Sequence, residues 1–570
     1  MIKRFLAIIM VVTLVMGNGV NILAAETTGD TLSVVSETKA EKSYELIIDN
    51  GVLSGYKGTP VDVVIPSSVK KIDEYAFYDC SSLKSIKIPS SVKEIGDYVF
   101  NCCRSLKSVK ISSGAKSIGE AVFAGCSSLT SIVIPSSVKS IGSYAFSSCT
   151  SLKSVKISSG VKEICDSAFY GCSRLKTIKI PSSVTEIGNS AFEDTLWLAT
   201  KQKKNPLVIV NGILIDGYKC KGDVKIPSKV KKIGHGAFAN CSGLKSIKIP
   251  SSVKAIGGSA FSYCNSLTSV EIPSSVKEIS DFTFSSCSSL KSIKIPSSVK
   301  KIGGYAFNSC NNLKSIKIPS SVKEIGGNAF TNTPWLQAKQ WENPLVIVNG
   351  ILIDGRKCKG DVKIPSKAKK IADYAFDSCN SLTSIEIPSS VKKIGEYAFY
   401  LCSSLKSIKI TSGIKEIGKG AFERCGNLTS IEIPSSVKAI GERAFSNCSS
   451  LKSIKIPSSV KEISNNVFSA CSSLKSIKIP SSVKAIGDSA FYSCNSLTSI
   501  EIPSKVKTIG QSAFYNCSSL KTIKIPSSVK AIGERAFDYV RGTFYVKKGS
   551  YAQSYLKKFY NSAKIKIWKK

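Results

Sequence analysis

Lysine is the residue type whose spacing most clearly suggests chemistry in this sequence. One position of a 23-residue pattern holds lysine in thirteen of its eighteen occurrences. These lysines are Lys87, Lys110, Lys156, Lys179, Lys225, Lys248, Lys294, Lys317, Lys363, Lys409, Lys455, Lys478 and Lys524, and we call them the lysine row. The other five residues are Val133, Glu271, Glu386, Glu432 and Glu501. An ammonium group offers three hydrogen-bond donors and no acceptor, so a regular row of them suits a polymer with repeated negative charges.

The charge of the whole chain points the same way. Its 79 lysines and arginines outnumber its 40 aspartates and glutamates, which leaves a formal net charge of +39. Such an excess predicts attraction to polyanions. We expect an extracellular glycan, a wall polymer or an acidic protein as the partner. Nucleic acid is a weaker candidate, because no base-stacking aromatic residues alternate with these lysines.

Cysteine recurs with the same period. Sixteen of the twenty cysteines follow a phenylalanine by three residues, as Cys80 and Cys103 do. Stacked strands would place neighbouring members about 4.8 Å apart, whereas a disulfide needs β-carbons about 3.8 Å apart. We therefore predict buried free thiols that act as small apolar side chains. The four cysteines outside this column could be exposed, and a disulfide among them stays open: Cys102, Cys165, Cys220 and Cys358.

The residues needed for catalysis or metal binding do not converge in the sequence. The single histidine, His235, stands where other repeats have Gly, Asp, Glu or Ser, so we expect it at the surface. No paired CxxC motif, nucleophile elbow or phosphate-binding loop occurs, and the many serines belong to a repeated turn. We therefore predict no enzyme activity, no metal and no cofactor.

Phenylalanine marks the register of the elements that must position these side chains. It recurs every 23 residues from Phe77 to Phe537, with two steps of 46 residues. Ile215 and Ile353 stand at the two skipped positions. Because the register never slips, we predict about twenty-one coils stacked in one repeat array.

One repeat can be translated into structure residue by residue. The alternation in 83–88 predicts a strand with one buried face, and Pro89 ends it because proline has no N–H. Val92 and Ile95 should turn inward again, and Gly96 suggests a bend with an unusual backbone conformation. A single coil cannot bury its apolar side, whereas stacked coils bury a continuous core.

The recurring sequence IPSSVKEIG…AF..CSSLKSIKIP resembles the BspA-like, or treponemal-type, leucine-rich repeats. The resemblance implies a curved right-handed solenoid with a parallel β-sheet on its concave side. It also implies a surface or secreted protein of a kind often linked with adhesion. It does not specify a ligand, because members of a repeat family share a scaffold and differ in what they bind.

The remaining segments complete the predicted organisation. The expected parts are a signal peptide (1–25), a disordered lead-in (26–43), an N-terminal cap (44–65), the solenoid (66–540) with interruptions at 195–226 and 333–364, and a C-terminal cap (541–570). Within the last part we expect strands at 543–546 and 564–568 around a helix at 551–560. Each interruption should hold a short helical piece and an Asn-Gly hairpin, which either contacts a ligand or serves as a spacer coil.

Two functional hypotheses follow. The favoured one is a secreted or non-covalently surface-associated binding protein that uses the lysine row to hold a polyanion. The alternative is a wall-associated coat protein held by charge without a specific ligand. A third reading of the row alone is that long side chains splay into water and salt screens their repulsion.

Overall fold

The computed structural model describes residues 44–560 and 563–568. The predicted signal peptide and lead-in lie outside these residues. The chain divides into two compact units, which are described separately: unit 1 comprises 1–161 with 168–181, and unit 2 comprises 162–167 with 182–570. Among the described residues no helix is long and apolar enough to cross a membrane.

Nearly every coil contributes one longer strand and one strand of two residues. The longer strands of unit 1 are β1 (Tyr44–Asp49), β2 (Val52–Gly58), β3 (Asp62–Val64), β5 (Ser85–Ile88), β7 (Ser108–Ile111), β9 (Ser131–Ile134), β11 (Ser154–Ile157) and β13 (Thr177–Lys179). Its two-residue strands are β4 (Lys71–Ile72), β6 (Glu94–Ile95), β8 (Ser117–Ile118) and β10 (Ser140–Ile141).

Unit 2 repeats this arrangement. Its longer strands are β15 (Val208–Val210), β16 (Ile213–Asp216), β17 (Gly222–Lys225), β19 (Leu244–Lys248), β21 (Ser269–Glu271), β23 (Ser292–Lys294), β25 (Ser315–Lys317), β27 (Val346–Val348), β28 (Ile351–Asp354), β29 (Gly360–Lys363), β31 (Leu382–Ile387), β33 (Ser407–Ile410), β35 (Ser430–Glu432), β37 (Ser453–Lys455), β39 (Ser476–Lys478), β41 (Ser499–Glu501), β43 (Thr522–Ile525), β45 (Thr543–Val546) and β46 (Lys564–Ile567). Its two-residue strands are β12 (Glu163–Ile164), β14 (Glu186–Ile187), β18 (Lys232–Ile233), β20 (Ala255–Ile256), β22 (Glu278–Ile279), β24 (Lys301–Ile302), β26 (Glu324–Ile325), β30 (Lys370–Ile371), β32 (Lys393–Ile394), β34 (Glu416–Ile417), β36 (Ala439–Ile440), β38 (Glu462–Ile463), β40 (Ala485–Ile486), β42 (Thr508–Ile509) and β44 (Ala531–Ile532). The described helices are α2 (Leu196–Lys204), α3 (Pro334–Glu342) and α4 (Tyr551–Phe559).

Strands of successive coils pair in parallel at the predicted period. In β5 and β7, Lys87 lies opposite Lys110 and Ile86 opposite Val109. We call the parallel ladder of the longer strands other than β1, β2, β15, β16, β27 and β28 the long ladder. The two-residue strands, together with β2, β16 and β28, form the short ladder. The predicted repeat solenoid is thus confirmed within each unit.

The core is a column of stacked side chains. Phe146 and Phe169 stack with ring centroids 5.2 Å apart and planes 3° apart, and both are fully buried. All twenty cysteines are free thiols, as predicted for the column. The Cys103 thiol also donates a hydrogen bond to the Phe77 carbonyl oxygen of the preceding coil at 3.1 Å, so the column adds polar contacts between coils as well as apolar volume.

A third hydrogen-bonded row runs along the phenylalanine segment, and the sequence did not predict it. The N–H groups of Tyr75, Phe77 and Asp79 donate to carbonyl oxygens of the following coil at 2.8–3.1 Å. To reach them the backbone adopts a left-handed conformation at Tyr75 (φ 59°) and at Asp79 (φ 52°), and most other coils repeat this pair. Non-glycine residues in this conformation cost about 1 kcal/mol each, which the ladder and the core must offset.

Glycine 96 serves a different purpose from the one expected. It lacks the left-handed φ that marks a strained bend. A Cβ atom at Gly96 would instead lie 2.8 Å from the Glu74 nitrogen and 3.1 Å from the Ile72 oxygen. The glycine is therefore needed for the close approach of two successive coils, not for an unusual backbone angle.

The interruptions contain the predicted helix and hairpin. In the second one, β27 and β28 pair antiparallel around Asn349 and Gly350, both of which have positive φ. Strand β28 then pairs in parallel with β30 and lies beside β26, so it takes one coil's place in the short ladder.

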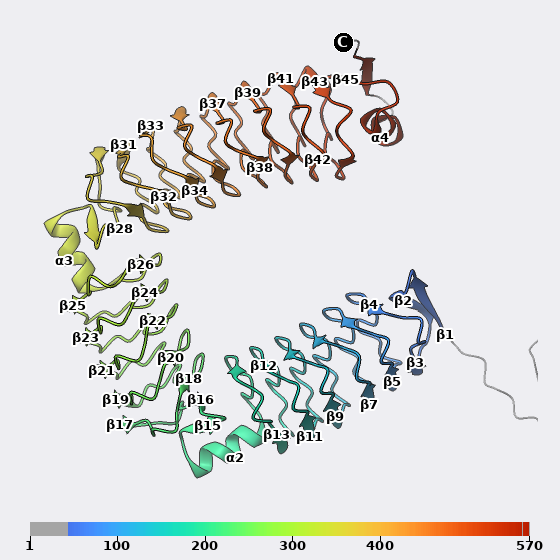
Figure 1. The fold of residues 1–570 in the computed structure, drawn as a ribbon, viewed down its shortest axis with the longest axis vertical. Helices are drawn as coiled ribbons and strands as arrows, with labels where there is room; N and C mark the ends of the chain where they lie inside the picture. The colour runs from blue at the N-terminus through green and yellow to red at the C-terminus, as the bar shows by residue number, and fades with distance from the viewer. Residues whose placement is uncertain (1–43, 561–562, 569–570) are drawn as a thin grey trace, which may run out of the picture. The chain divides into compact units, whose positions relative to one another are not determined.

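Helix α3 interrupts the long ladder of unit 2 between β25 and β29. It packs against β25, and the ladder from β17 ends at β25 and resumes only at β29. In Figure 1 the long ladder of unit 2 follows the outer side of the bend on both sides of α3, and the two-residue strands follow the inner side. The expected placement of the longer strands on the concave side is therefore wrong for unit 2. The physical reason is that the inserted helix widens the side on which the longer strands lie.

Candidate binding surfaces

The lysine row lies on the long ladder with its side chains pointing away from the core. Lys87, for example, stands exposed between the buried Ile86 and Ile88 of β5. The other members alternate in the same way, and all are exposed except Lys524. Lys524 is half-buried, because its ammonium group lies 5.5 Å from the centroid of the Trp568 ring.

Five pairs of these lysines are direct neighbours across the ladder. They are Lys87 and Lys110, Lys156 and Lys179, Lys225 and Lys248, Lys294 and Lys317, and Lys455 and Lys478. Like charges in such positions destabilise a sheet modestly. Within residues 44–560 and 563–568, ion pairs reach only three of the thirteen lysines. The other ten form no ion pair in these ranges, although Glu271 is the ladder neighbour of Lys248 and Lys294, and Glu432 is that of Lys455.

The row is not uniform along unit 2. Glu386 lies between Lys363 and Lys409, with carboxylate oxygens 3.6 Å from each ammonium group. Glu501 similarly lies 3.9 Å from Lys524. Glu271 and Glu432 stand in the same ladder, so acids relieve the repulsion at several points, as the sequence suggested. Pairs without an acidic ladder neighbour, such as Lys87 with Lys110, are the more strongly basic stretches.

The basic surface is hollowed where α3 meets the long ladder. A cavity of about 630 Å³ lies between β23, β25 and α3. Four lysines line it: Lys294, Lys314, Lys317 and Lys339. The buried ring of Trp335 forms its apolar wall. Lys339 pairs with Glu342 at 2.7 Å, so the other three supply most of the positive charge of this hollow.

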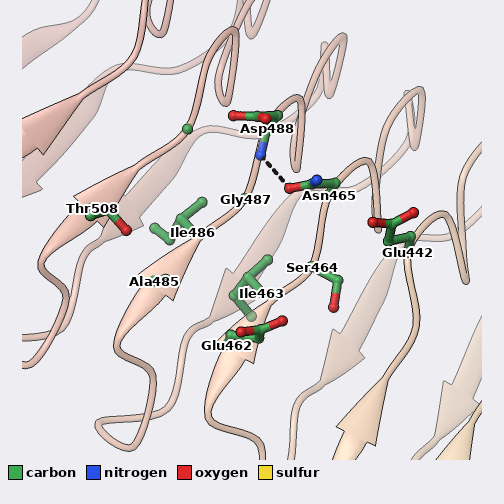
Figure 2. A pocket seen from close by; sticks show the side chains of 11 residues that line it. Glu442, Glu462, Ile463, Ser464, Asn465, Ala485, Ile486, Gly487, Asp488 and Thr508 are labelled. Carbon is green, nitrogen blue, oxygen red and sulfur yellow. Dashed lines mark hydrogen bonds between the residues drawn. The ribbon is translucent and has the colours of Figure 1, made fainter. Parts of the chain in front are cut away.

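A second type of hollow lies along the short ladder. Figure 2 shows one of about 350 Å³, lined by residues that include Glu442, Glu462 and Asp488. The Asp488 N–H donates to the Asn465 side-chain oxygen at 2.8 Å, and Asp488 accepts in turn from the Gln511 N–H at 2.7 Å. These polar residues thus satisfy the backbone of the following coil, a structural role that the sequence reasoning missed.

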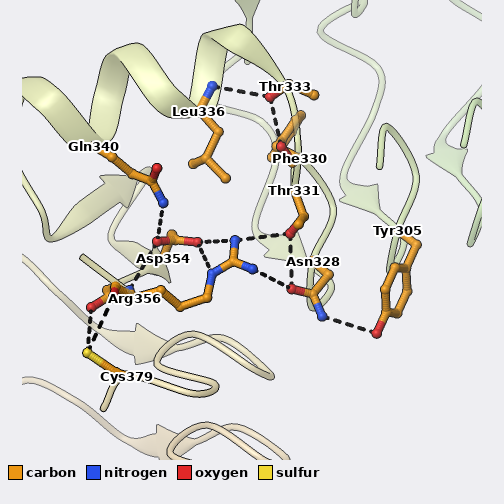
Figure 3. Close-up of polar contacts among 11 residues, drawn as sticks. Tyr305, Asn328, Phe330, Thr331, Thr333, Leu336, Gln340, Asp354, Arg356 and Cys379 are labelled. Carbon is orange, nitrogen blue, oxygen red and sulfur yellow. Dashed lines mark hydrogen bonds and ion pairs between the residues drawn. The ribbon is translucent and has the colours of Figure 1, made fainter. Parts of the chain in front are cut away.

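The second interruption also holds a buried polar network, drawn in Figure 3. Asp354 is 1 % exposed and pairs with the Arg356 guanidinium, whose Nε donates to Oδ2 at 2.7 Å. Gln340 of α3 donates to the other carboxylate oxygen at 2.8 Å. Arg356 also donates to Thr331 at 3.1 Å. The arginine therefore joins the hairpin to the preceding coil, and Gln340 joins the helix to the hairpin.

The first interruption lacks this arginine. Asp216 accepts from Gln202 at 2.9 Å, but Tyr218 stands where Arg356 would be, and its side chain is exposed. Burial raises the pKa of Asp216 above its usual value, and Glu193 adds to the effect. The two near-copies thus differ in whether a positively charged side chain pairs with the buried carboxylate.

Most of the thiols are buried in the folded protein. Of the four cysteines outside the column, Cys220 and Cys358 are buried, and only Cys102 and Cys165 are half-buried. Burial raises the pKa of Cys165 to about 11. His235 is exposed, as predicted. Across the described ranges no three metal-binding side chains gather into a candidate site.

Comparison with known proteins gives a consistent result. A family model described as a BspA type leucine-rich repeat region, in six copies, matches residues 56–165, 96–205, 218–337, 357–475 and 415–543. No curated protein matches the chain at the significance level applied.

Several solved structures are similar. A leucine-rich repeat protein from Bacteroides ovatus is 24 % identical, with 94 % of this chain and 100 % of that chain covered and a TM-score of 0.27. A leucine-rich cell surface protein from Faecalibacterium prausnitzii is 26 % identical, with 69 % and 96 % covered and a TM-score of 0.29. A leucine-rich repeat protein from T. pallidum is 23 % identical, with 53 % and 90 % covered and a TM-score of 0.20. Because the family model matches most of its length, the chain belongs to the BspA-type leucine-rich repeat family.

Proposed function

We propose that this protein is an extracellular binding protein that holds a polyanionic ligand on its lysine row. The ligand classes are a glycan with acidic groups, a wall polymer or an acidic protein. Export is supported by the positively charged start and apolar stretch within residues 1–25. A repeat scaffold also supports a binding role, because its extended face suits many weak contacts better than chemistry in an enclosed site.

The observation that carries the proposal is the set of five adjacent lysine pairs whose ammonium groups form no ion pair within the described residues. Two ammonium groups about 5 Å apart repel by roughly 1 kcal/mol in water, and salt reduces this further. The row is therefore tolerated without a ligand. An anionic group placed between two such lysines removes the repulsion and gains attraction from both. Each exposed contact contributes less than about 1 kcal/mol, so useful affinity must come from many contacts along one polymer.

We expect the ligand to make its tightest contact at the hollow between β23, β25 and α3. Lys294, Lys314 and Lys317 line one hollow there, so a single sulfate or carboxylate group can approach three ammonium groups. The Lys363 and Lys409 stretch offers less, because both ammonium groups already pair with the carboxylate of Glu386.

Binding of the full chain to immobilised heparin at several salt concentrations tests the proposal. The double variant Lys294→Gln with Lys317→Gln should weaken binding about tenfold and make it less dependent on salt, since fewer ions are released on binding. The matched control is Lys363→Gln with Lys409→Gln, which removes the same formal charge beside Glu386 and should have a much smaller effect. Binding that does not weaken between low and high salt would contradict the proposal, as would equal effects of the two double variants.

The coat-protein alternative predicts a different outcome. A protein held on the wall by overall charge alone should respond equally to both double variants, because both remove two positive charges. Washing intact cells with salt then distinguishes the cases further, since a coat stays with the wall until the wash and a released binding protein appears in the medium.

A further inference from the structure

A cavity of about 330 Å³ lies on the short-ladder side of unit 2, between the coils of β24 and β26 and the coil of β30. Aromatic rings stand at both of its ends. Phe282 stacks on Tyr305 with centroids 4.9 Å apart and planes 2° apart. Tyr374 stacks on Tyr397 at 5.3 Å and 11°. Phe282 is 43 % exposed, so the cavity presents an aromatic surface that the core does not use.

The cavity is hollow because glycines form its floor. Gly304 and Gly327 occupy the repeat position at which nearby coils have Asp281 and Asp373. A Cβ atom at Gly327 would lie 2.7 Å from the Tyr374 ring, so no larger residue fits there. At Gly304 the nearest atom would be 3.4 Å away. A side chain at Gly304 could therefore be accommodated by the fold, and its absence leaves space for a ligand.

Fixed polar groups surround this floor. Asp281 accepts from the Gly304 N–H at 2.7 Å, and Asp373 accepts from the Glu396 N–H at 2.8 Å, so the backbone orients both carboxylates. Lys370 also lines the cavity and supplies donors. A ligand with hydroxyl groups satisfies such a mixed set, because each hydroxyl both donates and accepts. The C–H face of a sugar ring, in addition, packs well on aromatic rings.

We propose that this cavity binds a neutral saccharide. It combines an aromatic surface with a few oriented polar groups, which is the usual composition of a small-molecule site. The carboxylates of Asp281, Glu324 and Asp373 line it and disfavour the polyanions expected at the lysine row. The proposal therefore adds a second site of different chemistry and does not depend on the first.

The near-duplication within the chain gives an independent observation. The second interruption, 333–364, is identical to 195–226 at 26 of 32 positions. The thirteen residues that line the cavity match their counterparts 138 residues earlier at only four positions. In the earlier copy Gly304, Tyr305, Gly327 and Tyr374 correspond to Asp166, Ser167, Asn189 and Gly236. The interruption is thus nearly constant, whereas the aromatic and glycine residues of the cavity are particular to the second copy.

The test uses the full chain on a panel of neutral oligosaccharides (glucans, galactans, mannans and N-acetylglucosamine oligomers), probed in 0.15 M and 1 M salt. We expect binding of at least one class, with little dependence on salt. Calorimetry with that oligosaccharide then compares two variants that change the cavity. Gly304→Asn fills the floor with a side chain that the same position carries elsewhere as Asn465, and Tyr305→Ser removes a ring. Each should weaken binding tenfold or more.

Two controls keep the result interpretable. Gln511→Asn changes the same repeat position in another coil and should leave saccharide affinity unchanged. The variant Lys294→Gln with Lys317→Gln should also leave it unchanged while weakening heparin binding. The proposal is overturned if no neutral oligosaccharide binds, if a small organic cation binds instead, if Gly304→Asn binds as well as the parent, or if saccharide binding falls with salt in step with heparin binding. Circular dichroism confirms that each variant remains folded.

Discussion

Replacing Arg356 with methionine should destabilise the second interruption by an amount that can be worked out from its contacts. Asp354 is 1 % exposed, and the arginine holds its Oδ2 through the side chain. Removing one partner of a buried ion pair costs about 3–5 kcal/mol. Two hydrogen bonds to Oδ1 remain, from Gln340 at 2.8 Å and from the backbone N–H of residue 356 at 3.2 Å. We therefore expect a loss near the lower limit, about 3 kcal/mol.

Hydrogen exchange of the α3 amides at pH 7 is the assay. Because a repeat protein need not unfold in one step, a local probe is more informative than a global melting temperature. Arg424→Met is the control. Arg424 is exposed and lies 5.9 Å from the Tyr400 ring, so its loss should cost less than about 1 kcal/mol. An equal loss of exchange stability in the two variants would refute the reasoning.

Three further predictions concern neighbouring features. Tyr218→Arg should supply the missing partner of Asp216 and stabilise the first interruption by about 1–2 kcal/mol at pH 7. Because burial raises the pKa of Asp216 in the folded state, its penalty exists only above that pKa, so the gain seen in denaturant unfolding should vanish as pH falls through it. Alkylation of the native protein at pH 8 should label only Cys102 and Cys165, which are half-buried. Labelling of Cys165 should be slow, because burial raises the pKa of its thiol to about 11. Mass spectrometry that found the core cysteines labelled would contradict this. Thr333→Val should remove the N-cap hydrogen bond to the Leu336 N–H, 3.2 Å long, and cost about 1 kcal/mol in the exchange stability of α3.

The period of the sequence was enough to predict the stack. A phenylalanine every 23 residues, an alternating strand and a proline stop together require coils that superimpose, and the Lys87 and Lys110 register agrees with that. The strands 543–546 and 564–567 and the helix 551–559 near the C-terminus also match their predicted positions to within one residue. These features were predictable because each rests on local pattern and on contacts between neighbouring coils.

The direction of bending was not predictable in the same way. It depends on which side of a coil the inserted helix widens, and nothing within one repeat specifies that side. The left-handed residues were missed for a related reason, since Tyr, Ser, Asp and Arg at these positions give no common signal for positive φ. The saccharide cavity was missed because it arises from two glycines and a ring contributed by different coils, Gly304, Gly327 and Tyr374. Only folding of the chain brings such residues together.

The stacking itself is tested most directly by zero-length cross-linking between carboxylates and lysines. The structure places Glu94 3.1 Å from Lys71, Glu278 3.0 Å from Lys301 and Glu416 2.7 Å from Lys393, and each pair is separated by one repeat. Carbodiimide treatment of the native protein followed by mass spectrometry should therefore yield cross-links concentrated at a sequence separation of 23 residues, together with one at 46 residues between Glu186 and Lys232 across the first interruption. Cross-links spread over unrelated separations would show that the coils do not superimpose.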